Sequence, residues 1–441
     1  MRRIIGSHAK SLFRAAKTTR GFSSEASTSE TSSAPPILRP DLNFEFLLDD
    51  KNLEAIKENI QSRKGVGNIE KVREKWSTIQ QLMHSGKPEI GAEKIDEAKY
   101  EQLWNELYEE ALLIPNMTQD GVPKGSENEA KTIAEWGEKR EDEALLTAEK
   151  LVQSWRALLH PNEACGQRSY VFLGALASFE KALLEYAYER VCALGFRPIT
   201  VPDIVSEEIT SACGLMQTSE HPIQYSLKNS KESHLKLSGT AEMGIAAFLR
   251  GRTFEESQLP IRLVSMSRCF RTEISKSASE AKLYRVHEFS KVEMFVVCTP
   301  EQSQAELDYL VEIQKGTFQT LGIHCRQLEM PSEELGASAA KKYDIEAWMP
   351  GRKLYGEVSS ASNCTDFQAR RLGIKMKNKD GETFYCHTCN GTALASTRTL
   401  ISILETFQNN KKGLGELPEP IRNRIKQRGN ALKFQTAKSL I

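Results

Sequence analysis

"SRCFRTEISKSASEAKLYRVHEFSKVEMF", residues 267–295, predicts two β-strands joined by a loop over residues 274–284. Alternate side chains of a strand point to one face. We therefore expect the following side chains to share a face of the paired strands: Arg271, Glu273, Arg285, His287, Phe289, Lys291 and Glu293. A water-exposed sheet face explains the charges, Lys291 among them. It does not explain Phe289, whereas an aromatic ring between arginines and carboxylates suits a flat base that carries phosphates.

The chain has 441 residues, which is enough for two or three domains. Its 39% apolar and 27% charged residues are typical of a globular protein. No run reaches the roughly 20 apolar residues of a membrane helix, so we expect no membrane partner. The formal net charge is +0 at pH 7, and any nucleic-acid binding therefore requires local basic patches.

Residues 1–24 are basic, contain no acid and are rich in Ser, Thr and Ala. This pattern predicts a mitochondrial transit peptide, and hence the mitochondrial matrix, with a disordered basic tail as the alternative. Residues 25–40 are rich in Ser, Thr and Pro and predict a disordered linker.

The nine cysteines are scattered and odd in number, which favours free thiols in a reducing compartment. Cys386 and Cys389 form one close pair, but a structural zinc site needs about four ligands, usually from two such pairs. His387 and the distant Cys364 could complete a four-ligand zinc site only if the fold happened to bring them beside this pair. A zinc-stabilised nucleic-acid binder is therefore the weakest hypothesis.

Residues 50–113 predict three helices separated by glycines and prolines. Apolar residues recur every three or four positions in the second helix (69–82) and the third (103–112), which predicts an antiparallel helical hairpin. Each hairpin helix is expected to have about 20 residues and a length of about 30 Å. An ordinary helical subdomain has the same spacing. Residues 114–148 are charged and predict a loop-like hinge.

A long helix is expected near residues 169–195, and strands with helices between them follow to about residue 410. Clean βαβ repeats are few, so we predict an α+β fold with a mostly antiparallel sheet backed by helices. "FRPITVPDIV" (196–205) contains two prolines and predicts an edge strand or a bend.

Several ordered motifs resemble those of one enzyme family. "FRTE…YRVHEFSKVEMF" resembles motif 2 of the class II aminoacyl-tRNA synthetases, and more narrowly its seryl-tRNA synthetase form. "SGTAEMG" (238–244) resembles the family's Thr-Ala-Glu loop, and "GEVSSASNCTDFQARR" (356–371) resembles a family signature over its whole length. "NGTALASTRTLISILE" (390–405) resembles motif 3, and "FRPITVPDIV" resembles motif 1. Motifs of this length rarely occur together by chance.

The resemblance implies a class II antiparallel sheet flanked by helices, preceded by a short coiled-coil arm that binds tRNA. The implied segments are an arm at 41–125, a connector at 126–160, a catalytic domain at 161–420 and a basic C-terminal tail at 421–441. The implied reaction activates L-serine with ATP and transfers it to mitochondrial tRNA(Ser), in a homodimer that uses Mg²⁺. Neither step needs a covalent enzyme nucleophile, because catalysis rests on positioning and charge. Relatives commonly have an arginine followed by a glycine in the motif 2 loop, where this sequence has Ala281 and Lys282. In the family this loop meets the acceptor end of the tRNA.

By the same resemblance, Arg271, Glu357 and Arg398 are the catalytic residues. Arg271 contacts the α-phosphate and the serine carboxylate, Arg398 the γ-phosphate, and Glu357 with Ser360 the Mg²⁺ ion. Glu273 recognises adenine and Phe289 stacks on it. The implied ATP-binding set is Arg271, Thr272, Glu273, Arg285, Val286, His287, Glu288, Phe289, Glu357, Val358, Ser359, Ser360 and Arg398.

The implied serine-binding set is Thr240, Ala241, Glu242, Arg271, Glu293 and Thr392. Buried carboxylates accept from an ammonium and a hydroxyl, and a site built this way rejects alanine because its polar groups stay unpaired. The alternative is a non-catalytic relative with the same fold. Such a protein has no need of Arg271, Glu357 or Arg398, all of which are present.

Overall fold

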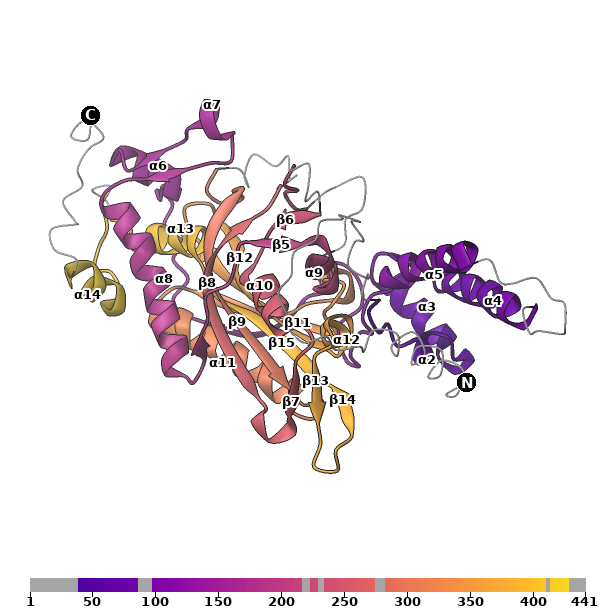
Figure 1. Ribbon diagram of the computed structural model, residues 1–441. Helices are drawn as coiled ribbons and strands as arrows, with labels where there is room; N and C mark the ends of the chain where they lie inside the picture. The colour runs from indigo at the N-terminus through magenta and orange to yellow at the C-terminus, as the bar shows by residue number, and fades with distance from the viewer. Residues whose placement is uncertain are drawn as a thin grey trace, which may run out of the picture. The chain divides into compact units, whose positions relative to one another are not determined.

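The structure is a computed structural model that describes residues 39–85, 97–215, 223–228, 234–273, 282–409 and 413–427. The expected transit peptide, most of the linker, the motif 2 loop from 274 to 281 and the chain from 428 onward lie outside these residues. The described residues from Pro40 onward belong to one compact unit. Figure 1 shows its elements along the chain.

An eight-stranded sheet forms the centre of this unit, in the order β1-β10-β11-β12-β15-β9-β8-β4. Its strands are β1 (Lys131–Trp136), β4 (Arg197–Pro198), β8 (Ile261–Phe270), β9 (Glu288–Cys298), β10 (Cys325–Glu329), β11 (Lys341–Met349), β12 (Leu354–Thr365) and β15 (His387–Ala395). All neighbours pair antiparallel except β4, which lies parallel to β8 at the edge. The predicted antiparallel α+β fold and the proline-containing edge strand are confirmed.

Smaller pieces surround this sheet. A three-stranded sheet contains β7 (Thr253–Glu255), β13 (Lys375–Lys377) and β14 (Thr383–Tyr385). Two ribbons pair β2 (Leu158–Leu159) with β3 (Val171–Phe172), and β5 (Ile204–Ser206) with β6 (Leu235–Leu237). The 3₁₀ helices are η1 (Asp50–Asn52), η2 (Glu127–Glu129), η3 (Glu256–Gln258) and η4 (Ser332–Glu334).

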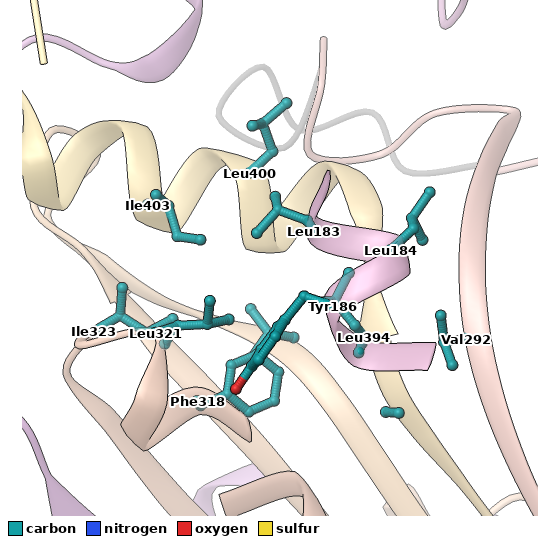
Figure 2. Packing of buried hydrophobic residues seen from close by; sticks show 14 of the residues in the cluster. Leu183, Leu184, Tyr186, Val292, Phe318, Leu321, Ile323, Leu394, Leu400 and Ile403 are labelled. Atoms are coloured by element: carbon teal, nitrogen blue, oxygen red, sulfur yellow. The ribbon is translucent and has the colours of Figure 1, made fainter. Parts of the chain in front are cut away.

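Helices cover both faces of the sheet (Figure 1). The long α8 (Ala175–Ala193), α11 (Ser303–Thr320) and α13 (Ser396–Phe407) pack on one face through a core cluster of Leu, Ile, Val and Phe (Figure 2). The other face carries α9 (Glu207–Ala212), α10 (Ala241–Leu249) and α12 (Phe367–Leu372). Successive side chains of strand β9 point to opposite faces of the sheet, so β9 contributes to both cores: Met294 packs in the first cluster and Phe295 in the second. Among the described helices, none is long and apolar enough to span a bilayer.

The predicted strand pair is present as β8 and β9, with Cys269 opposite Phe289. The strands are shorter than expected, however. Arg271 follows β8 and His287 precedes β9, and the pairing continues between them through a hydrogen bond from the Arg271 amide to the His287 carbonyl (2.9 Å). Glu273 also lies beyond the strand, with φ at +42°. These side chains are therefore aimed by loop geometry and not by strand alternation.

The N-terminal region contains α2 (Phe44–Leu47), α3 (Leu53–Ser62), α4 (Ile69–Ser85) and α5 (Glu97–Leu112). The rings of Trp76 and Trp104 meet edge to face, 5.9 Å apart, and Lys71 and Glu110 pair at the base of the hairpin. The predicted antiparallel hairpin is confirmed. Its helices have 17 and 16 residues, so each is about 25 Å long, somewhat shorter than predicted.

Two stretches contain regular structure that their composition did not predict. The stretch predicted as a loop-like hinge holds β1, which pairs with β10 and forms an edge of the central sheet, and α6 (Ala148–Ser154) follows it. The predicted tail begins with α14 (Glu419–Gln427), in which Ile421 and Ile425 are buried against the core. The strand β1 was not predicted because its segment is rich in charged residues. The helix α14 was not predicted because basic residues surround its few apolar ones. The short α7 (Asn162–Cys165) completes the helices of this part.

Arg63, at the end of α3, joins the helical region to the sheet domain. It is 5% exposed, and its guanidinium donates to the carbonyls of Asn116 (2.9 Å), Ala339 (2.8 Å), Leu335 (3.4 Å) and Gly336. Burial lowers the pKa of Arg63 to about 10, so the side chain remains charged at neutral pH. Four carbonyl oxygens thus replace the water that this buried cation gives up.

We expect Arg63→Met to lower the free energy of unfolding by about 2–4 kcal/mol, because two buried and two part-buried carbonyls lose a charged donor. Lys64→Met is the matched control: the neighbouring Lys64 is 55% exposed and pairs only with Glu334, so its loss should cost less than about 1 kcal/mol. Urea unfolding followed by circular dichroism measures both. Equal losses would contradict this account of the joint.

Candidate active site

A pocket with about 460 Å³ of space that no protein atom fills, part of it open solvent, lies over the strands of the central sheet. Its walls come from strands β9, β12 and β15, from the residues that follow β8 and precede β9, and from the first turn of α13. Its lining residues are Arg271, Glu273, Tyr284, Val286, Phe289, Lys291, Glu357, Val358, Ser359, Thr392, Ala395, Thr397 and Arg398. The three expected catalytic residues therefore come together, although they are separated by up to 127 positions in the chain.

One wall of the pocket combines cations with an aromatic face. The guanidinium of Arg271 lies 5.3 Å from the centre of the Phe289 ring. Arg285 and Glu273 pair at 3.4 Å beside it, with the Glu273 side chain 11% exposed. The backbone of Arg271 is held by His287, whose Nδ1 lies 3.1 Å from the Arg271 carbonyl oxygen. An aromatic plate next to a fixed guanidinium is suited to a base and its phosphates.

The opposite wall is built around Arg398, in the first turn of α13. Its Nη1 donates to the Glu357 carbonyl (3.0 Å) and approaches the Glu357 carboxylate (3.4 Å), and its guanidinium lies 4.7 Å from the centre of the Tyr284 ring. Burial opposes ionisation of Glu357, but Arg398, Lys342 and Arg271 outweigh it and hold its pKa below the ordinary value. The Glu357 side chain is still 44% exposed. A charged carboxylate is thus open to the pocket.

A buried ion pair lies at the pocket floor. Lys291 Nζ contacts Glu293 Oε2, and the two side chains are only 7% and 3% exposed. The Thr392 hydroxyl donates to the same oxygen (3.2 Å). The interpretation of Lys291 as part of a water-exposed face is therefore wrong. Neighbouring residues of a strand point to opposite faces, and it is Glu288 that lies outside, paired with Arg268 at 2.7 Å.

Glu242 lies close to this floor. Thr240 caps the N-terminus of α10, where its side chain accepts from the Glu242 amide (3.3 Å) and Ala241 is the first helical residue. Glu242 Oε1 accepts from Gln368 Nε2 (2.5 Å) and Asn390 Nδ2 (2.9 Å). Burial, and then the nearby Glu293, raise the pKa of Glu242 to about 7.

Some of the remaining predicted residues line the pocket, and the others do not. Val286, Val358 and Ser359 line it, and the Ser359 hydroxyl donates to the Thr392 carbonyl. Thr272 donates its amide to Ile223 (3.2 Å). Side chains of the predicted residues Thr240, Ala241, Glu242, Thr272, Arg285, His287, Glu288, Glu293 and Ser360 are not among those that line the pocket.

Sequence reasoning missed several contributors. Tyr284 and Lys291 line the pocket, while Asn390 and Gln368 hold Glu242 from behind. Asp344, 4% exposed, lies opposite Ser360 in the β11–β12 pairing. The alternating charges of 285–293 could have identified Lys291. No local pattern identifies Asp344, because its role depends on which strand lies beside it.

The cysteine pair does not form a metal centre. Cys386 packs in one core cluster and Cys389 in the other, on opposite faces of the sheet. Burial raises the pKa of Cys386 to about 12, which keeps it a neutral thiol. Within the described residues, no three His, Cys, Asp or Glu side chains are placed to hold a metal ion by themselves.

The raised pKa of Glu242 predicts a pH-dependent stability. The unfolded chain ionises this carboxyl near 4.5 and the folded chain near 7, so stability from this group is lost as the pH rises between these values. Glu242→Gln removes the charge and keeps the shape. Its advantage over the wild type in thermal unfolding should grow from pH 4.5 to pH 7 and then level off. The exposed Glu208→Gln is the control, and a pH-independent difference for Glu242→Gln would refute the assignment.

Comparison with known proteins agrees with this geometry. Residues 225–407 match the family model described as the tRNA synthetase class II core domain (G, H, P, S and T). The mitochondrial serine–tRNA ligase of Mus musculus is 41% identical over 315 residues, which cover 70% of this chain and 60% of the mouse protein. The chain thus spans less than two thirds of that relative's length. The serine–tRNA ligase of Treponema denticola is 32% identical over 420 residues, 86% of this chain and 97% of that relative.

A solved structure, the seryl-tRNA synthetase from Pyrococcus horikoshii complexed with ATP, aligns with a TM-score of 0.73 and 27% identity. The alignment covers 87% of this chain and 98% of that one. The chain therefore belongs to the serine–tRNA ligase family of the class II aminoacyl-tRNA synthetases.

Proposed function

We propose that this protein is a serine–tRNA ligase that activates L-serine with ATP and transfers it to mitochondrial tRNA(Ser). The observation that carries the proposal is the meeting of Arg271, Phe289, Glu357 and Arg398 around one pocket, directly above the buried Lys291–Glu293 pair. Such a pocket offers an aromatic surface for a base, two arginines for phosphates, and carboxylates below for an amino acid.

The chemistry proposed for the pocket is positioning and charge stabilisation. Adenine lies against Phe289 near Glu273, and the guanidinium of Arg271 is placed to bind both the α-phosphate and the attacking serine carboxylate. Arg398, anchored by two contacts to Glu357, binds the far phosphates. Because guanidinium groups stay charged, no proton has to move for these contacts to strengthen as the phosphate charge redistributes.

Mg²⁺ fits the oxygen donors at this edge of the pocket. Glu357 is ionised and partly exposed, and the Oδ1 atom of Asp344 is buried without a hydrogen-bond partner among the described residues. Oxygen ligands of this kind are those that Mg²⁺ prefers. We propose that Glu357 and Ser360 would hold the ion, which would supply positive charge to offset that of the phosphates.

Serine selection is assigned to Thr240, Ala241, Glu242, Glu293 and Thr392. The two carboxyl groups bind the ammonium and the side-chain hydroxyl, while Lys291 and Thr392 contact the buried Glu293. Alanine lacks the side-chain hydroxyl, so the carboxylate oxygen that would accept from it loses this donor, which penalises alanine by orders of magnitude. Threonine adds a methyl group to a floor that is already packed.

The helical hairpin is the proposed tRNA-binding arm, and the chain is proposed to act as a homodimer in the mitochondrial matrix. The transit-peptide pattern of residues 1–24 and the mitochondrial mouse relative support this location. Exposed apolar side chains near the β8 edge support self-association: Met266 is 43% exposed on β8, and Ile204 is 49% exposed on β5.

Serine-dependent ATP–pyrophosphate exchange on the full chain tests the activation step. Exchange is expected with serine but not with alanine or threonine. Arg271→Ala should lower kcat/KM by about a hundredfold or more, because the α-phosphate loses a fixed charge. Arg268→Ala is the control, since this arginine pairs with Glu288 outside the pocket and should act like the wild type. Exchange without serine, or equal losses in both variants, would refute the proposal.

The arm can be tested by removing it at its base. Gly67 lies so close to Leu113 that a β-carbon would come within 2.9 Å of the Leu113 carbonyl oxygen, so deletion of residues 68–112 joins neighbouring points. We expect affinity for tRNA(Ser) to fall by about tenfold or more as phosphate contacts are lost, with pyrophosphate exchange unchanged. Filter binding measures this, with a non-serine tRNA as the control. Unchanged tRNA affinity would contradict the assignment of the arm.

A further inference from the structure

Gln368 is a buried amide that lies behind the pocket and does not line it. It is the second residue of α12 and is 0% exposed. Its Nε2 donates to Glu242 Oε1 at 2.5 Å, and its Oε1 accepts from the Thr388 hydroxyl at 2.7 Å. Thr388, on β15, is also 0% exposed. The three side chains form a hydrogen-bonded chain from the sheet to the carboxylate.

Both ends of this amide have partners of the correct kind. The NH₂ end meets an acceptor-only carboxylate, and the carbonyl end meets a hydroxyl that donates. A reversed amide would place its carbonyl oxygen against the Glu242 carboxylate, which is unfavourable when Glu242 is charged. The carboxylate therefore selects the orientation of the amide, and the Thr388 hydroxyl holds the other end in place by donating to Oε1.

Glu242 needs such support because of its surroundings. Burial and the nearby Glu293 raise its pKa, whereas the Gln368 hydrogen bond, Lys291 and Arg271 lower it. Gln368 and Asn390 both donate to Oε1, and no described residue donates to Oε2. One oxygen is thus held in place by the protein, and the other is left for a ligand.

We propose that Gln368 is a positioning residue for serine binding: held by Thr388, it fixes the Glu242 carboxylate so that Oε2 can accept from the substrate ammonium. The inference rests on the proposed function and adds two residues to it. Neither residue touches the substrate. Their effect acts through Glu242, so it belongs to serine binding and not to ATP binding.

Gln368→Met keeps the volume of the side chain and removes its donor. In pyrophosphate exchange at pH 7, the serine KM should rise about tenfold or more while the ATP KM stays within about twofold of the wild type, since a hydrogen bond to a charged group is lost. The pH at which serine binding is half-maximal should move upward, because the lost bond lowered the Glu242 pKa. The variant leaves the other titratable and charged groups near the Glu242 carboxylate unchanged. They are Arg271, Lys291, Glu293 and the thiols of Cys213 and Cys364.

Thr388→Val and Thr388→Ser form a matched pair that tests the same chain from its other end. Valine removes the hydroxyl at equal size and should raise the serine KM several-fold, whereas serine retains the hydroxyl and should behave as the wild type. If Gln368→Met does not fold, the two Thr388 variants are sufficient to test the inference.

If the wild type is active and the valine and serine variants have the same serine KM, the inference is overturned. Parallel rises in the serine and ATP KM values do so too, because they indicate general damage. A wild type without serine-dependent exchange overturns the proposed function itself.

Discussion

The candidate site depends on two neighbouring carboxyl groups, those of Glu242 and Glu293. Burial and the nearby Glu293 raise the pKa of Glu242, whereas Lys291 lowers it. Lys291 also pairs with Glu293, and both of these side chains are almost fully buried. The floor thus holds two carboxyl groups and one ammonium group. A ligand that brings a second ammonium group completes the charge balance, so the site is suited to a small amino acid.

The sheet holds these charges because its strands are fixed from both faces. Gln314 on α11 donates to the carbonyls of Ser360 (2.8 Å) and Thr392 (3.0 Å), and so ties β12 to β15 below the pocket. The apolar cluster shown in Figure 2 fixes the same strands on that side. Side chains on such strands lose little further entropy when a ligand binds, since their positions are already set. Rigid strands thus carry Glu293 and Thr392, two of the residues to which serine selection is assigned.

Much of this arrangement was readable from the sequence where the signal was local. Period-two alternation predicted the β8–β9 pair, and apolar stripes predicted the hairpin helices. Motif likeness led to Arg271, Glu357 and Arg398, which the structure brings together. Features that depend on distant neighbours were not readable. The pairing of β1 with β10 joins residues almost 200 positions apart, and the burial of Lys291 depends on what packs over its strand. The roles of Gln368 and Asp344 arise only once α12 and β11 are in place.

The close approach of Gly67 and Leu113 gives the arm the character of an interchangeable module. A hairpin whose two ends meet can grow or shrink by whole helical turns without moving the points where it leaves the domain. Under the tRNA-binding role proposed for the arm, lineages that change the size of their tRNAs can adjust its reach by insertion or deletion at the tip. The Arg63 joint and the chemistry beyond it need no compensating change, and so substrate recognition and catalysis are free to evolve at separate rates.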